Sequence, residues 1–141
     1  MADLTYTVYT GELVLLSQKG EVIVTFAESG FSNYWWDSTQ VEKGKHGKPG
    51  HVEGGPIPSG TWRVHRPGSL HPDHGKPRPD WIPVGPIRGR SLIYIHCENR
   101  SEGCINIPKH RPGNRERFEA IKRILAEENG GWMTVMGGGV A

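Results

Sequence analysis

Glycine and proline interrupt this chain so often that long helices have little room to form. The 20 glycines and 11 prolines together exceed a fifth of the 141 residues, a composition typical of a domain with many turns. Hydrophobic residues make up 35% of the chain and lie in short blocks between these breaks. We therefore expect a folded domain with long loops. The length fits one hydrophobic core, and hence a single domain spanning residues 1–141.

Most of the apolar blocks have the length and alternation of β-strands. Val22, Val24 and Phe26 recur with a period of two, which predicts a half-buried strand. By the same reasoning we expect strands over residues 5–9, 12–16, 21–26, 61–64, 91–96 and 132–136. The first three are close in sequence and predict a β-meander.

One helix is expected, near the C-terminus. Asn114 is suited to cap its start, and Gly130 supplies a stop. The apolar side of this helix is formed by Phe118, Ile121, Ile124 and Leu125. The predicted fold class is therefore mainly β, with long loops and one main α-helix near the C-terminus.

Charge and hydropathy exclude several classes of function. The formal net charge is only +2, and the 17 basic residues are spread along the chain, so we expect no nucleic-acid partner. No segment approaches the roughly 20 apolar residues that span a bilayer, so we expect no membrane partner. The first residues lack the basic and apolar regions of a signal peptide, so we expect synthesis as a cytoplasmic chain.

The segment from residue 92 to residue 108 carries the most chemical information. An apolar strand ends in His96, a polar turn follows, and Gly103 and Cys104 lead into a second apolar segment. An adjacent imidazole lowers the pKa of a thiol and returns the proton to a leaving group. Gly103 allows close approach of a substrate and exposes amide N–H groups that stabilise an oxyanion. This pattern predicts a thiol nucleophile, although a buried structural cysteine and a histidine bonded to a carbonyl remain alternatives.

Cys97 adds a further alternative. It and Cys104 are the two cysteines of the chain and lie seven residues apart. A disulfide between them in an oxidising compartment would consume the nucleophile.

Two motifs resemble those of a known family. Ile95-His96, followed by Ser101-x-Gly103-Cys104-Ile105, resembles the active-site signature of the L,D-transpeptidase catalytic domain. The upstream segment 55–62, Gly-Pro-Ile-Pro-Ser-Gly-Thr-Trp, resembles the Gly-x-Ile-Pro-x-Gly-x-aromatic turn that precedes the catalytic strands in this family. The short chain and the compressed His–Cys spacing make it most similar to the L,D-transpeptidase-like effectors of type VI secretion systems.

The resemblance implies a β-rich fold and peptidoglycan stem peptides as substrate. It makes Cys104 the nucleophile and His96 the general base, with Ser101 and Gly103 shaping the turn and the oxyanion pocket. The thiol would attack the carbonyl of the third stem residue and expel D-alanine. Water as acceptor gives L,D-carboxypeptidase activity, and an amine gives transpeptidation or D-amino-acid exchange. No cofactor is implied. An effector would be exported to the periplasm of a target cell, with a cognate immunity protein as a possible partner.

Departures from the signature leave the substrate contacts open. Asn106 stands where an arginine commonly follows the Cys-Ile pair, so another arginine could take over the binding of a substrate carboxylate. The candidates are Arg88, Arg90 and Arg100. Trp35 and Trp36, in the long polar stretch before the Gly-Pro turn, are candidates for lining the substrate groove or, alternatively, for pinning this loop onto the sheet.

Two other functions compete with this one. His71 and His74, in a proline-rich loop, suggest a zinc hydrolase, but a zinc site needs three or four placed ligands, so no metal is expected. His65, on the strand after the Gly-Pro turn, could orient His96 or be a surface residue. A non-catalytic wall-binding module of the same fold would use tryptophans, among them Trp81, to stack on sugar or peptide.

Overall fold

The computed structural model describes residues 1–29, 56–98 and 104–137 of the chain. Its strands are β1 (Ala2–Thr7), β2 (Glu12–Leu16), β3 (Val22–Phe26), β4 (Glu28–Ser29), β5 (Gly60–Val64), β6 (Ile82–Val84), β7 (Ile93–His96), β8 (Ile105–Asn106) and β9 (Gly131–Met136). The helix α3 spans Asn114–Glu127. The predicted fold class, mainly β with one helix near the C-terminus, is confirmed.

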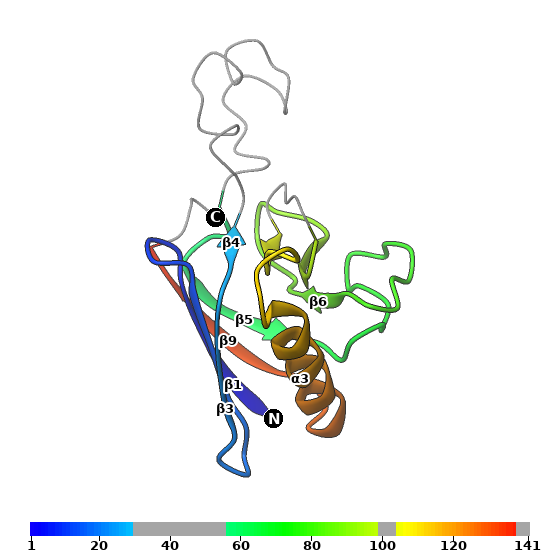
Figure 1. Cartoon of the computed structure of the whole chain (residues 1–141). Coiled ribbons are helices and arrows are strands. Elements are labelled where there is room, and N and C mark those ends of the chain that lie inside the picture. Colours follow the sequence, from blue (N-terminus) through cyan, green and yellow to red (C-terminus); the bar gives the residue numbers. More distant parts are fainter. Residues whose placement is uncertain (30–55, 99–103, 138–141) are drawn as a thin grey trace.

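All nine strands belong to one sheet that bends back on itself. Their order is β3-β2-β1-β9-β5-β6-β7-β8-β4. β3 and β4 occupy the two ends of this order, yet only Ala27 separates them along the chain. The two edges of the sheet are therefore covalently joined, which forces a strong curl (Figure 1).

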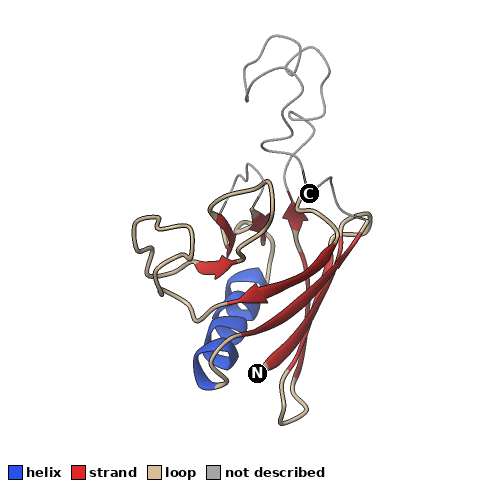
Figure 2. Ribbon diagram, turned by 180° about the vertical axis from the view of Figure 1, so that it is seen from behind, coloured by secondary structure: helices blue, strands red, loops and turns tan. Residues whose placement is uncertain are grey.

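The hydrophobic core lies between the inner face of the sheet and α3 (Figures 1 and 2). The helix contributes its predicted apolar side, namely Phe118, Ile121, Ile124 and Leu125, all of which are buried. β1 and β2 contribute alternate residues, among them Tyr6 and Leu15, which are fully buried. This alternation follows from the period of two in a strand, which sends successive side chains to opposite faces.

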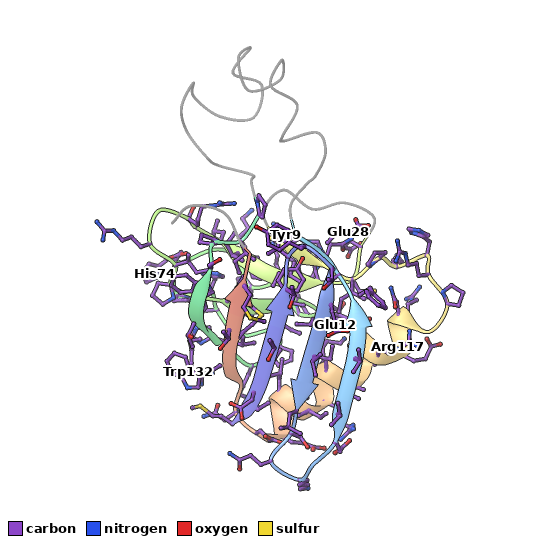
Figure 3. The ribbon with its side chains drawn as sticks, turned by 90° about the vertical axis from the view of Figure 1, so that its left-hand side faces the viewer. Tyr9, Glu12, Glu28, His74, Arg117 and Trp132 are labelled. Carbon is purple, nitrogen blue, oxygen red and sulfur yellow. The ribbon has the colours of Figure 1, made fainter. Side chains whose placement is uncertain are left out.

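The outer face of the meander differs from the expectation for β3. The strand alternates as predicted, but Val22, Val24 and Phe26 face outward and are 57%, 45% and 51% exposed. The inward residues are Ile23, which is partly buried and packs against the core, and Thr25, whose hydroxyl donates to Oδ1 of Asn114 in α3 at 3.3 Å. The inward face of β3 thus combines an apolar contact with the core and a polar contact with the helix. Figure 3 shows the outer face, with Glu12 and Trp132 among its side chains.

The helix start also differs from the prediction. Gly113 is the N-cap, with φ of 81° and no side-chain capping bond, and Asn114 is the first helical residue. The Asn114 side chain is buried and donates to the carbonyl of Pro108 at 2.8 Å instead of capping the helix. At the other end Gly130, with φ of 82°, donates its N–H to the carbonyl of Leu125, as expected of a terminating glycine.

The described part of the Gly-Pro motif, residues 56–62, is a structural turn. The indole N–H of Trp62 donates to the carbonyl of Pro58 at 2.9 Å, which folds the ring back over the turn. Gly60 has φ of 150°, and a Cβ atom there would lie 2.6 Å from the Trp62 ring. Only glycine fits this position. Ile57 is fully buried and donates its N–H to the Ser29 hydroxyl, which ties the turn to β4.

Candidate active site

His96 is the last residue of β7, and it is 3% exposed. Its Nδ1 atom lies 3.0 Å from Oδ1 of Asn106, the residue paired with it on β8. The same oxygen accepts the backbone N–H of Glu98 at 2.8 Å, which identifies this end of the amide as the acceptor. Nδ1 of His96 therefore carries a proton and donates it to Asn106. Nε2 is left as the basic nitrogen of the neutral imidazole.

Burial sets the basicity of this imidazole. The pKa of His96 lies below its ordinary value, above all because burial disfavours the imidazolium, and Arg78 adds to the decrease. The hydrogen bond to Asn106 and the carboxylate of Glu98 act in the opposite direction. At neutral pH the ring is thus uncharged, which is the state that a general base requires.

An aromatic stack covers the imidazole. The Trp81 and His96 rings lie 4.5 Å apart, centroid to centroid, with their planes tilted by 35°. The guanidinium of Arg78 lies over the Trp81 ring, 4.4 Å from its centroid. Trp81 also meets Tyr94 edge-on at 5.2 Å. The loop before β6 thereby supplies an aromatic wall that shields the base from water.

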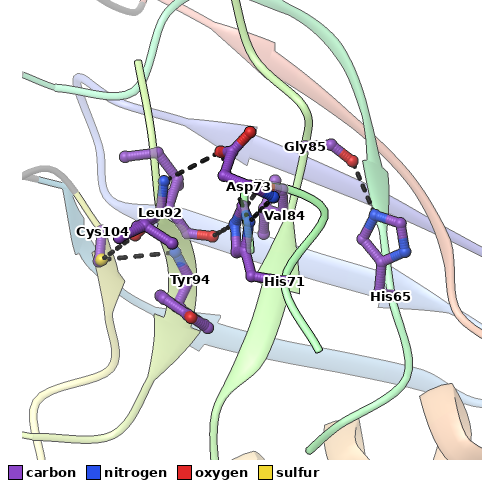
Figure 4. Close-up of polar contacts among 9 residues, drawn as sticks. His65, His71, Asp73, Val84, Gly85, Leu92, Tyr94 and Cys104 are labelled. Carbon is purple, nitrogen blue, oxygen red and sulfur yellow. Dashed lines mark hydrogen bonds and ion pairs between the residues drawn. The ribbon is translucent and has the colours of Figure 1, made fainter. Parts of the chain in front are cut away.

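The thiol of Cys104 lies beside the first half of β7 (Figure 4). Its sulfur accepts the backbone N–H of Tyr94 at 3.4 Å, and its S–H donates to the carbonyl oxygen of Leu92 at 3.7 Å. β7 and β8 run parallel with His96 opposite Asn106, so Cys104 lies two residues before the partner of His96. Cys104 directly precedes β8, so its thiol lies beside the start of β7, whereas the imidazole of His96 lies at the end of β7.

A network of backbone contacts holds the start of β7 (Figure 4). Leu92 has a left-handed backbone with φ of 55°, and its N–H donates to Oδ2 of Asp73 at 3.1 Å. The Asp73 N–H donates to Nδ1 of the buried His71 at 2.9 Å. Nε2 of His71 bridges two strands, since it donates to the carbonyl oxygens of Val84 in β6 (3.1 Å) and Ile93 in β7 (2.9 Å). Both nitrogens of this imidazole are engaged in the scaffold.

The described residues contain no candidate metal centre. Within residues 1–29, 56–98 and 104–137, no group of three or more His, Cys, Asp or Glu side chains is placed to hold a metal ion. His71, one member of the pair that suggested zinc, uses its nitrogens for backbone contacts. In the same part of the chain, no helix is long and apolar enough to cross a membrane.

Several predicted site residues lie outside the described residues. These are Trp35, Trp36, Arg100, Ser101 and Gly103. The groove-lining, carboxylate-binding and oxyanion roles assigned to them stay predictions.

The other predicted residues have defined surroundings. Arg88 is exposed, whereas Arg90 is buried and donates to the carbonyl of Pro56 at 3.2 Å. His65 places Nε2 2.7 Å from the carbonyl oxygen of Gly85, on the opposite side of the network from Cys104 in Figure 4. Asn106 contacts the imidazole of His96 directly, and the orienting role of His65 stays a prediction. The substrate-binding roles of both arginines remain predictions.

Cys97 directly follows His96, the last residue of β7. Its side chain is partly buried and packs against the hydrophobic core. Burial raises the pKa of its thiol. Neither Cys97 nor Cys104 is disulfide-bonded in this structure.

Sequence reasoning missed three residues at this site. From the sequence, Asn106 is only the residue that replaces an arginine of the signature. Its spacing of two from Cys104 is the available signal, because residues two apart in an extended chain share a face. Trp81 is predicted from the sequence only to stack on sugar or peptide. The contact of Asp73 with Leu92 had no local signal, because 19 residues separate them.

Comparison with solved structures places the fold among known ones. The chain is similar to the helical cell shape determining protein Pgp2 of Campylobacter jejuni (K307A mutant), with a TM-score of 0.51 and 14% identity over 95% of this chain and 46% of that one. It also matches L,D-transpeptidase 1 of Mycobacterium tuberculosis, with a TM-score of 0.47 and 18% identity over 96% of this chain and 61% of that one. At such identities the similarity to Pgp2 concerns the fold alone. The chain spans about half to three fifths of the length of these neighbours. No family model and no curated protein sequence matches it.

Proposed function

We propose that this chain is a cysteine acyl-transfer enzyme acting on peptidoglycan stem peptides, with Cys104 as nucleophile and His96 as general base. The observation that carries the proposal is the parallel pairing of β7 and β8, which brings the cysteine segment beside the strand that ends in the histidine. The two sequence motifs support an L,D-transpeptidase or L,D-carboxypeptidase activity. The similarity of the fold to a cell shape determining protein supports a role in wall chemistry.

The chemistry follows from the tautomer of His96. Its Nε2 is the basic nitrogen. Nδ1 keeps its proton throughout the reaction and donates it in a hydrogen bond to Asn106. The thiol of Cys104 leaves the Leu92 carbonyl, a weak contact at 3.7 Å, and gives its proton to Nε2. The N–H of Tyr94 stabilises the thiolate that forms.

Acyl transfer then proceeds in two halves. The sulfur forms a bond to the carbonyl carbon of the third stem residue, the C–N bond to D-alanine breaks, and the imidazolium of His96 returns its proton to the departing amine. The resulting thioester on Cys104 is released by water, which gives a tripeptide. An amine acceptor gives a cross-link or an exchanged D-amino acid instead.

Mass spectrometry of muropeptides incubated with the purified protein tests the reaction. We expect tetrapeptides to be shortened or their D-alanine replaced. Cys104→Ala and His96→Gln should abolish this change, whereas the matched control Cys97→Ala should retain it. Unchanged muropeptides with the wild-type protein, or activity in Cys104→Ala, contradict the proposal. A wild-type protein that binds wall material without turnover points to the non-catalytic binding module.

The place of action that we propose follows from the substrate. Stem peptides of the wall lie outside the cytoplasm, so an effector of this chemistry acts in the periplasm of a target cell, with an immunity protein as its partner in the producing cell. Expression directed to the periplasm tests this: lysis with the wild-type chain and growth with Cys104→Ala are expected. Equal growth of both strains counts against an antibacterial role.

A further inference from the structure

The segment containing His71 and Asp73 takes no part in the proposed reaction, although it lies next to the thiol. We propose that Asp73 is a positioning residue for Cys104: its carboxylate holds Leu92 in the left-handed conformation that directs the Leu92 carbonyl toward the thiol. The inference rests on the proposed function, because it assigns a role at the same site.

The backbone of Leu92 needs such a contact. A φ of 55° is unfavourable for leucine, because its Cβ crowds the backbone in the left-handed region. Its side chain is 42% exposed, so core packing does little to hold it. The N–H of this residue is bonded to Asp73, and its carbonyl accepts the thiol proton of Cys104. One strained residue thus links the carboxylate to the nucleophile.

The carboxylate is itself held in place. The N–H of Asp73 donates to His71, whose ring is 1% exposed and bridges β6 and β7. The chain of contacts therefore runs from a buried imidazole through Asp73 and Leu92 to the sulfur of Cys104 (Figure 4). His71, at the far end, is buried and hydrogen-bonded through both ring nitrogens, which makes this series of contacts rigid.

Loss of the carboxylate has a defined consequence for the thiol. Without it Leu92 relaxes toward an extended backbone, and its carbonyl turns away from the sulfur. A carbonyl acceptor favours the protonated thiol, so its loss lowers the pKa of Cys104. The thiol then ionises more readily but has lost the contact that fixed its direction, so turnover falls.

Four variants in a Cys97→Ala background test this. Asp73→Ala removes the acceptor of the Leu92 N–H, and Asp73→Asn removes the charge but keeps an acceptor oxygen. Asp73→Ala combined with Leu92→Gly supplies a residue that adopts the left-handed backbone without strain. Asp80→Ala is the matched control, since this exposed loop carboxylate contacts Lys122 at 3.4 Å. The readouts are the pH dependence of alkylation by iodoacetamide, which needs no substrate, and kcat and KM on a tetrapeptide.

For Asp73→Ala we expect the midpoint of the alkylation profile to fall by about half a unit to one unit. We also expect kcat to fall by about tenfold with little change in KM. Asp73→Asn should lie close to the parent, and Leu92→Gly should restore part of the kcat lost in Asp73→Ala. A parental profile and kcat in Asp73→Ala overturn the proposal, as does a double variant no better than Asp73→Ala. If the alkylation profiles behave as expected but no variant releases D-alanine, the positioning role stands and the proposed reaction fails.

Discussion

Oδ1 of Asn106 lies 3.0 Å from Nδ1 of His96 and accepts the N–H of Glu98 at the same time. Two donors converge on one amide oxygen, so the amide cannot rotate without leaving both unpaired inside the protein. The tautomer of the proposed base is thus fixed by a residue on the neighbouring strand.

Replacement of Asn106 should therefore impair the base without removing it. Asn106→Ala takes away a bond that raises the pKa of His96, so we expect the acidic limb of the kcat/KM profile to move to lower pH. The tautomer is no longer fixed, and kcat should fall about 10- to 100-fold. Asn106→Asp places a carboxylate at the same position and should move the limb to higher pH. Identical pH profiles for all three proteins would show that this contact does not govern the base.

The lowered pKa of His96 makes stability depend on pH. The ordinary value is 6.5, and the folded protein binds this proton less readily than the unfolded chain. Between 6.5 and the lower folded value, the unfolded chain therefore binds more protons, and the free energy of unfolding rises with pH. The stability is fully present above pH 6.5 and is lost as the pH falls below it.

Urea unfolding at a series of pH values between 5 and 8 measures this dependence. We expect His96→Gln to remove part of the slope below pH 6.5. The indole of Trp81 stacks on this ring, so its fluorescence should decrease as the imidazolium forms, and Trp81→Phe should lose that component. A slope unchanged in His96→Gln would assign the dependence to another group.

The two thiols should differ in reactivity. Burial raises the pKa of Cys97, so less of it is thiolate at neutral pH than for an exposed cysteine. In Cys104→Ala, we expect iodoacetamide to label Cys97 more slowly at pH 7 than it labels free glutathione, with the difference closing in urea. Peptide mapping by mass spectrometry measures the rate. Equal rates in the folded and unfolded states would place Cys97 in a more open environment.

The two faces of the meander should respond differently to truncation. Leu15 is fully buried, and Leu15→Ala should lower the free energy of unfolding by about 2–5 kcal/mol. Val24 lies on the outer face of the neighbouring strand, and Val24→Ala should cost less than about 1 kcal/mol. Denaturant unfolding of the two variants measures these losses in the free energy of unfolding. A larger loss for Val24→Ala would show that the outer face is covered in solution.

Much of the fold could be predicted from local patterns. The spacing of turns and apolar residues predicted β1, β2, β3, β5, β7 and β9 to within a few residues, and the apolar side of α3 was identified correctly. The short strands β4, β6 and β8 were not predicted, and β6 lies in a stretch that was expected to be a loop. The buried face of β3 was predicted wrongly, because Val22, Val24 and Phe26 form three apolar positions on one face, whereas the inward face carries Ile23 and the polar Thr25. The hydroxyl of Thr25 contacts Asn114, 89 residues away, and no local pattern predicts this contact.

The site was predictable only where it consists of motifs. His96 and Cys104 are predicted from residue type and order, and the structure places Cys104 directly before β8, the strand that pairs with the end of β7. The contacts that surround them join distant segments, such as Trp81 with His96 and Asp73 with Leu92. The left-handed backbone of Leu92 could not be predicted from its residue type, because leucine rarely adopts this conformation.

The parallel register of β7 and β8 has a consequence for finding relatives of this protein. His96 and Asn106 are matched by the hydrogen-bond ladder, not by the number of residues that connect the two strands. Insertions and deletions in that connection change the number of residues between His96 and Cys104 and leave the strand pairing intact. A homologue is therefore better sought by two short strands, one ending in histidine and one beginning after cysteine, than by a fixed distance in sequence between the two residues.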